Sequence, residues 1–78
     1  MILNIISPEE KFSCNIKSIT FPGAAGSFTI LDNHAPIFSL LQKGTVSYCC
    51  DEKGNEIEFQ IKRGFMEATQ KEVNVFVN

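Results

Sequence analysis

Apolar and polar residues alternate with a period of two along most of this chain, and this pattern restricts its fold more than any other feature. In the cleanest run, Ile57, Phe59 and Ile61 occupy every second position, with charged or amide side chains between them. Because successive side chains of a β-strand point to opposite faces, such a run predicts a strand with one face on a core and the other in water. No long segment has the spacing of an amphipathic helix.

Further alternating runs cover residues 3–5, 12–16, 45–50 and 72–78. Proline and glycine residues separate them, and residues 51–55 are typical of a hairpin loop. The apolar set switches from even positions ending at Ile16 to odd positions beginning at Ile19, which predicts a bulge or sharp bend near Lys17 and Ser18. Many short strands with regular turns predict an all-β fold, an antiparallel sandwich or barrel.

Size and charge exclude several classes of function. A chain of 78 residues forms one small domain and leaves little volume for a deep small-molecule cleft. Its net charge is −2 and its basic residues are scattered, so it lacks the basic stripe of a nucleic-acid binder. The longest apolar stretch, Ala35 to Leu41, is too short to span a membrane. We therefore expect membrane association only through a partner.

No residue pattern indicates catalysis, a cofactor or a metal site. The only histidine, His34, follows Asp32 and Asn33 directly, and three consecutive side chains do not simply converge on one reacting atom. The segment Gly23 to Gly26 lacks the lysine and the following helix of a phosphate-binding loop. We expect no catalytic residue, no cofactor and no metal.

The three cysteines, Cys14, Cys49 and Cys50, are too few for a disulfide framework, and their odd number fits a reducing compartment. Cys49 and Cys50 are neighbours on a predicted strand, so we expect one in the core and one outside, poorly placed to bridge each other.

Apolar residues also exceed what one inward stripe can hold. Phe38 and Leu40 lie in such a run, and Phe76 faces away from Val75. Either the core is very full, or the chain exposes an apolar patch of the kind that marks a partner surface; we favour the partner surface.

The sequence resembles the N-terminal domain of the epsilon subunit of bacterial rotary (F-type) ATP synthase. The segments that carry this resemblance occur in the family's order along the whole chain: residues 3–9, 22–28, 30–37, 41–46, 64–67 and 73–75. The most specific part is Asn33-His34-Ala35-Pro36 after a Pro-Gly-x-x-Gly loop. Thr29, Asp32, Lys43 and Arg63 depart from the usual pattern.

The resemblance implies one domain, residues 1–78, with a two-sheet antiparallel β-sandwich of about eight to ten short strands and no substantial helix. It implies a non-catalytic rotor subunit of the central stalk, which binds the gamma subunit and the polar loops of the c-ring and couples ion flow to ATP synthesis. It also implies a peripheral location on the cytoplasmic face of the bacterial inner membrane, within a hetero-oligomer.

Contact residues are carried over from the same resemblance. Gly26, Ser27 and Phe28 are expected to face the c-ring. Ser7, His34 and Ser39 are expected to contact gamma, and Asn33, Pro36 and Phe38 are added because they lie close to these residues in the sequence. The sequence stops at Val77-Asn78, where family members continue into a helical hairpin, so we expect neither hairpin inhibition of ATP hydrolysis nor a nucleotide site.

Two other functions stay open. One is a small β-sandwich adaptor that binds another protein or a carbohydrate. The other is a small hydrolase built on His34 with Ser39 or Asp32, although the sequence shows no nucleophile elbow.

Overall fold

The computed structural model describes residues 1–50 and 54–78, and this part of the chain consists of strands and turns without a helix. The nine strands are β1 (Ile2–Ile6), β2 (Lys11–Asn15), β3 (Ser18–Gly23), β4 (Gly26–Leu31), β5 (Ile37–Leu41), β6 (Gly44–Cys50), β7 (Asn55–Ile61), β8 (Gly64–Ala68) and β9 (Glu72–Val77). The predicted all-β class is confirmed. Within the described residues, no helix could cross a membrane.

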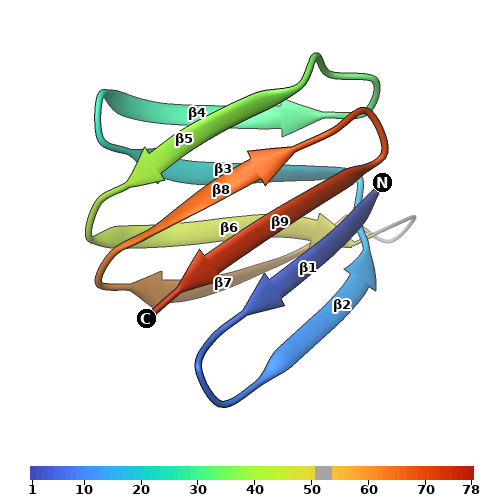
Figure 1. Ribbon diagram of the computed structural model, residues 1–78. Helices are drawn as coiled ribbons and strands as arrows, with labels where there is room; N and C mark the ends of the chain where they lie inside the picture. Colours follow the sequence, from blue (N-terminus) through green and yellow to red (C-terminus); the bar gives the residue numbers. More distant parts are fainter. Residues whose placement is uncertain (51–53) are drawn as a thin grey trace.

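Two layers of strands face each other (Figure 1). Hydrogen bonds connect the strands in the order β2-β1-β9-β8-β5-β3-β6-β7, with β4 paired to β3. Strands β5, β8, β9, β1 and β2 run diagonally across the front of Figure 1 and form what we call the front layer, whereas β4, β3, β6 and β7 form the back layer. The expected two sheets are thus halves of one curled sheet.

The two layers are joined where β3 meets β5. Their ladder holds a single residue pair, Gly23 with Leu41. A Cβ on Gly23 would lie 2.6 Å from the carbonyl oxygen of Gly26 and 2.7 Å from the Phe28 ring. Only glycine leaves room for the backbone at this joint, because any side chain would press on a neighbouring main chain.

One pairing differs from the antiparallel expectation. Strands β1 and β9 run parallel, with Leu3 opposite Val73 and Ile5 opposite Val75. They are the first and last strands of the chain, and no short turn connects them, so nothing in the local connectivity requires an antiparallel pair.

The core lies between the layers and contains the inward residues of the alternating runs. Its fully buried large side chains are Leu3, Ile19, Phe21, Val46, Met66, Val73 and Val75. The expected phase break proves to be a change of layer: β2 ends at Asn15, Ile16 is buried, and β3 begins at Ser18 in the back layer.

The outer face of the back layer is polar. Glu56, Glu58 and Gln60 are exposed on β7, and Gln60 Nε2 donates a hydrogen bond to Thr45 Oγ1 over 2.6 Å. The antiparallel register of β6 and β7 confirms the predicted hairpin, although residues 51–53 of its loop lie outside the described part.

Candidate partner-binding surface

The outer face of the front layer carries a row of apolar side chains that crosses four strands. The strand register places Ile6 of β1 opposite Phe76 of β9, Phe76 opposite Phe65 of β8, and Phe65 opposite Leu40 of β5. Phe38 lies one pleat away on β5. We call these five residues the apolar row. Adjacent strands lie about 4.8 Å apart, so the row is roughly 14 Å wide.

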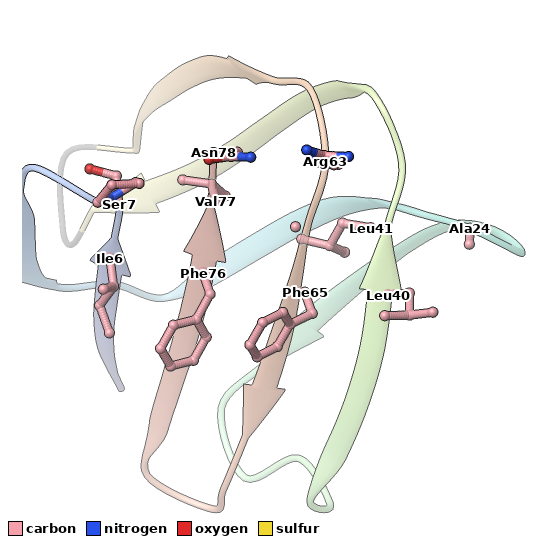
Figure 2. A pocket seen from close by; sticks show the side chains of 12 residues that line it. Ile6, Ser7, Ala24, Leu40, Leu41, Arg63, Phe65, Phe76, Val77 and Asn78 are labelled. Atoms are coloured by element: carbon pink, nitrogen blue, oxygen red, sulfur yellow. The ribbon is translucent and has the colours of Figure 1, made fainter.

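Aromatic contacts order the centre of this row. The rings of Phe65 and Phe76 stack with their centroids 4.7 Å apart, and the ring of Phe38 lies 5.6 Å from that of Phe65. Figure 2 shows the Phe65 and Phe76 rings side by side. Because such pairs favour one geometry, the row is a preformed surface rather than a set of mobile side chains.

Water reaches much of this apolar surface. Phe38 and Leu40 are each 61% exposed, and Phe65 is 37% exposed. An open hollow of about 710 Å³ adjoins the row, and its lining includes Ile6, Leu40, Phe65 and Phe76. Contiguous exposed apolar surface of this kind is typical of an interaction site.

Polar side chains lie beside the apolar row on the same face. Asn4 of β1 donates a hydrogen bond to Asn74 Oδ1 of β9 over 2.8 Å, and Ser13 of β2 donates to Asn4 Oδ1 over 2.6 Å. Glu67 lies opposite Asn74 and beside Phe38. The front face is therefore divided: the apolar row lies at one end, and Asn4, Ser13 and Asn74 form a hydrogen-bonded polar group beside it.

The residues expected at the c-ring lie in and after the turn between β3 and β4. Gly26 has a φ of 132°, a conformation that favours glycine, and both Gly26 and Ser27 are exposed. Phe28 instead turns towards the core, where its ring lies 5.5 Å from that of Phe21. Ala24 of this turn lines the hollow beside the apolar row (Figure 2).

The structure divides the residues expected to contact gamma between two ends of the front layer. Ser7 follows Ile6 and lines the hollow. Asn33, His34 and Pro36 precede Ile37, which pairs with Ala68 at the opposite end of the layer.

Strand β5 connects these two ends. Phe38 belongs to the apolar row, whereas Ser39 is half-buried and its hydroxyl donates to the Leu40 carbonyl over 3.1 Å. Asn33 has a φ of 64°, which asparagine tolerates better than most residues.

The structure does not bring the side chains of the hydrolase alternative together. His34 Nδ1 lies 3.1 Å from the carbonyl oxygen of Ala35, and its buried Nε2 has no hydrogen-bond partner among residues 1–50 and 54–78. Asp32 accepts from the N-terminal amine of Met1 over 3.2 Å. Within the described residues, no group of three or more His, Cys, Asp or Glu side chains could hold a metal ion. The structure gives His34 no hydrogen-bonded Ser39 or Asp32.

Sequence comparison decides the family. A profile of the family described as "ATP synthase, Delta/Epsilon chain, beta-sandwich domain" matches residues 1–78. The chain belongs to this family. The predicted resemblance to the epsilon subunit is thereby confirmed.

Named relatives of this ATP synthase delta/epsilon family are similar along the chain. The ATP synthase epsilon chain of Anaeromyxobacter is 33% identical over 79 aligned positions, covering 100% of this chain and 58% of the relative. That of Chlorobium limicola is 37% identical, covering 86% and 76%. That of Wolinella succinogenes is 44% identical, covering 68% and 39%. The chain thus spans roughly half the length of several relatives that it matches.

Solved structures support the same fold for this family member. A chain from the central stalk and c-ring of the Tetrahymena thermophila mitochondrial ATP synthase superposes with a TM-score of 0.83 at 14% identity, over 99% of this chain and 62% of that one. A chain from the Euglena gracilis mitochondrial ATP synthase gives 0.87 at 19% identity, over 96% and 48%.

Sequence reasoning assigned Phe38 to gamma and noted Leu40 and Phe76 among the surplus apolar residues, but it left out Ile6 and Phe65. The structure shows that Phe65 and Phe76 face outward, because their neighbours Met66 and Val75 are fully buried. The strand order was missing, and without it the outward residues of β1, β5, β8 and β9 could not be placed side by side.

Proposed function

We propose that this chain is a non-catalytic subunit of the central stalk of an F-type ATP synthase. It binds the gamma subunit through the apolar row and the polar loops of the c-ring through the β3–β4 turn, and so couples ion translocation to ATP synthesis. The complex holds it at the cytoplasmic face of the bacterial inner membrane. The exposed apolar row on a close-packed sandwich is the observation that carries this proposal.

The row suits a permanent interface better than a transient one. Long-lived interfaces are more hydrophobic than the rest of a protein surface, and aromatic anchors supply most of their binding energy. Phe65 and Phe76 are already stacked, so they lose little conformational freedom when gamma covers them. A rotor part also has to resist deformation, and a close-packed core of two layers deforms little.

The β3–β4 turn offers a different surface. Gly26 and Ser27 are exposed and small, which allows close approach of a polar loop with water-mediated or main-chain hydrogen bonds. Because Ala24 lines the hollow beside the apolar row, the two proposed interfaces adjoin at one end of the domain. A subunit with this arrangement contacts the gamma subunit and the c-ring at the same time.

The remaining predicted gamma contacts fit this proposal in two groups. Ser7 borders the hollow and extends the interface at the end where the c-ring turn lies. Asn33, His34 and Pro36 extend it along β5 towards the opposite end, with Phe38 and Ser39 between the groups.

Two leucines with equal exposure test the gamma interface. Leu40 lies in the apolar row and Leu31 on β4 of the back layer, and each is 61% exposed. We expect Leu40→Ala to weaken binding to purified gamma by roughly tenfold or more, as for a truncated anchor at the centre of an interface. Leu31→Ala should leave binding unchanged. Both variants should keep the Tm of the parent within a few degrees.

Surface plasmon resonance with immobilised gamma measures both variants and Phe38→Ala. Equal losses at Leu40 and Leu31, or no loss at Leu40 and Phe38, would contradict the assignment of the row to gamma. If the parent chain failed to bind gamma but captured an unrelated protein or a carbohydrate, the adaptor function would replace the rotor function.

A further inference from the structure

Two cysteines from opposite layers meet at one side of the sandwich. Cys14 lies on β2 of the front layer and Cys50 at the end of β6 in the back layer, and both pack against the same core cluster. Both also line one open cavity of about 590 Å³ beside the N-terminus. Neither thiol is part of the apolar row or the β3–β4 turn.

The two thiols are neighbours at the edge of the core, since both pack against the same buried cluster and line the same cavity. Burial together with the neighbouring Cys50 raises the pKa of the Cys14 thiol to about 11. The pKa of Tyr48 is raised by burial and by its proximity to both cysteines. These three groups therefore form one cluster at the edge of the core.

We propose that Cys14 and Cys50 are a redox-modification site, which closes to a reversible disulfide between the two layers when a small disulfide such as oxidised glutathione enters the cavity. The proposal concerns the isolated domain and does not depend on the rotor function. It differs from a structural disulfide of a secreted protein, because the cysteines are reduced in the structure and the cross-link forms only under oxidising conditions.

The reaction is thiol–disulfide exchange in two steps. One protein thiolate attacks a sulfur of oxidised glutathione and breaks its S–S bond. One glutathione thiolate is released, and the other glutathione stays bound to the protein as a mixed disulfide. The second protein thiolate attacks the protein sulfur of that mixed disulfide and displaces the second glutathione. The two electrons and two protons given up by the cysteine thiols end on two molecules of reduced glutathione.

The cavity suits this reagent. Lys17 in its lining offers a positive charge to the carboxylates of the tripeptide. Asp32, the acidic group of the same lining, is paired with the N-terminal amine at 3.2 Å, which reduces its repulsion of an anion.

The cross-link would join parts that the described backbone pairing leaves separate. Strand β2 pairs only with β1 among the described strands, and β6 pairs with β3 and β7. A bond between Cys14 and Cys50 would close a ring over nearly half of the chain, and closing a long ring removes much of the conformational freedom of the unfolded state. The oxidised domain should therefore be more stable than the reduced one.

Cys49 provides a matched control within the same strand. Its neighbour Cys50 packs against the core cluster, whereas Cys49 is not part of that packing. It is half-buried like the other two cysteines, so a difference in exposure would not explain a difference in reactivity. Cys49 differs from Cys50 because neighbouring side chains of a strand lie on opposite faces.

The experiment treats the full chain with oxidised glutathione at pH 8 and alkylates the remaining thiols after unfolding. Intact mass and peptide mapping identify the linked pair, and thermal unfolding is followed with and without dithiothreitol. We expect a Cys14–Cys50 disulfide with Cys49 alkylated or glutathionylated, and an oxidised Tm higher by on the order of 10 °C. Dithiothreitol should reverse both changes.

Three variants sharpen the result. Cys49→Ser should keep the cross-link and the Tm shift, whereas Cys14→Ser and Cys50→Ser should lose both. A Cys49–Cys50 disulfide, glutathione adducts without a Cys14–Cys50 link, or a Tm shift that survives in Cys14→Ser would overturn the proposal. The peptide map of the parent chain decides the question even if a serine variant fails to fold.

Discussion

The outer faces of the two layers differ, although the same alternation of residues builds both. The back layer presents Glu56, Glu58 and Gln60 to water, whereas the front layer presents the stacked rings of Phe65 and Phe76. Both layers bury apolar side chains on their inner faces, so folding alone requires no apolar residue on the outer face of the front layer. We therefore interpret the apolar row as a surface for the proposed partner rather than as a requirement of folding.

The comparison is sharpest on strand β8, where neighbouring residues face opposite sides. Met66 is fully buried, so Met66→Ala should lower the free energy of unfolding by about 3 kcal/mol through lost contacts and a residual cavity. Phe65→Ala should lower it by only about 1 kcal/mol while it abolishes most gamma binding. Urea unfolding and a binding assay on both variants check this. A larger stability loss at Phe65 than at Met66 would mean that the apolar row serves folding.

The joint between the layers gives the next largest effect. A Cβ at Gly23 has no room beside the Gly26 carbonyl and the Phe28 ring, so Gly23→Ala should lower the free energy of unfolding by about 2 kcal/mol. Thermal unfolding measures it, with Gly54→Ala as a control because a Cβ there meets open space, although its φ of 68° adds some strain. Equal small losses at both glycines would show that the joint is loosely packed.

The polar end of the front face should respond to a smaller degree. Asn4 holds β2 and β9 through hydrogen bonds to Ser13 and Asn74, so Asn4→Ala should lower the free energy of unfolding by about 1 kcal/mol. Gamma binding should stay unchanged, since Asn4 lies outside the apolar row. If Asn4→Ala kept its stability but lost gamma binding, the gamma interface would extend beyond the apolar row to the polar side chains.

Substitutions on the outer face of the back layer should have the smallest effects on stability and on gamma binding. Gln60→Ala removes one exposed hydrogen bond to Thr45, and we expect a change below about 0.5 kcal/mol in the free energy of unfolding and none in gamma binding. Urea unfolding of this variant beside Asn4→Ala gives the contrast. A loss of gamma binding at Gln60 would place a partner on the face that we describe as solvated.

Much of the fold follows from the sequence alone, because period two is a local property. The runs at 57–61 and 72–77 form β7 and β9, and the phase break near Lys17 coincides with the change of layer. The parallel pairing of β1 with β9 was not predicted, since alternation specifies which face a residue occupies and not which strand lies beside it. Ile57 shows a further limit: it keeps the inward phase but is 44% exposed on β7, the last strand in the pairing order of the described residues.

The candidate surface was predictable only in part for the same reason. Phe38 was assigned from its proximity to residues that the resemblance implies, and the sequence showed that Phe76 faces away from Val75, but it did not show that Phe65 lies on the same face as Phe76. Their meeting with Ile6 and Leu40 depends on three strand pairings, of which β1 with β9 and β5 with β8 join residues far apart in the sequence. Cys14 and Cys50 illustrate the same point, because their proximity arises between layers and no spacing rule relates them.

The parallel pair of β1 and β9 also bears on how this protein is made. The hydrogen bond from Asn4 to Asn74 spans 70 residues, so β1, which can pair early with β2, has to wait for β9 before its second edge is covered. Pairings of such high contact order form slowly and expose unpaired strand edges in the meantime. During synthesis the emerging chain would therefore hold an open β1 edge until residues 72–77 have left the ribosome.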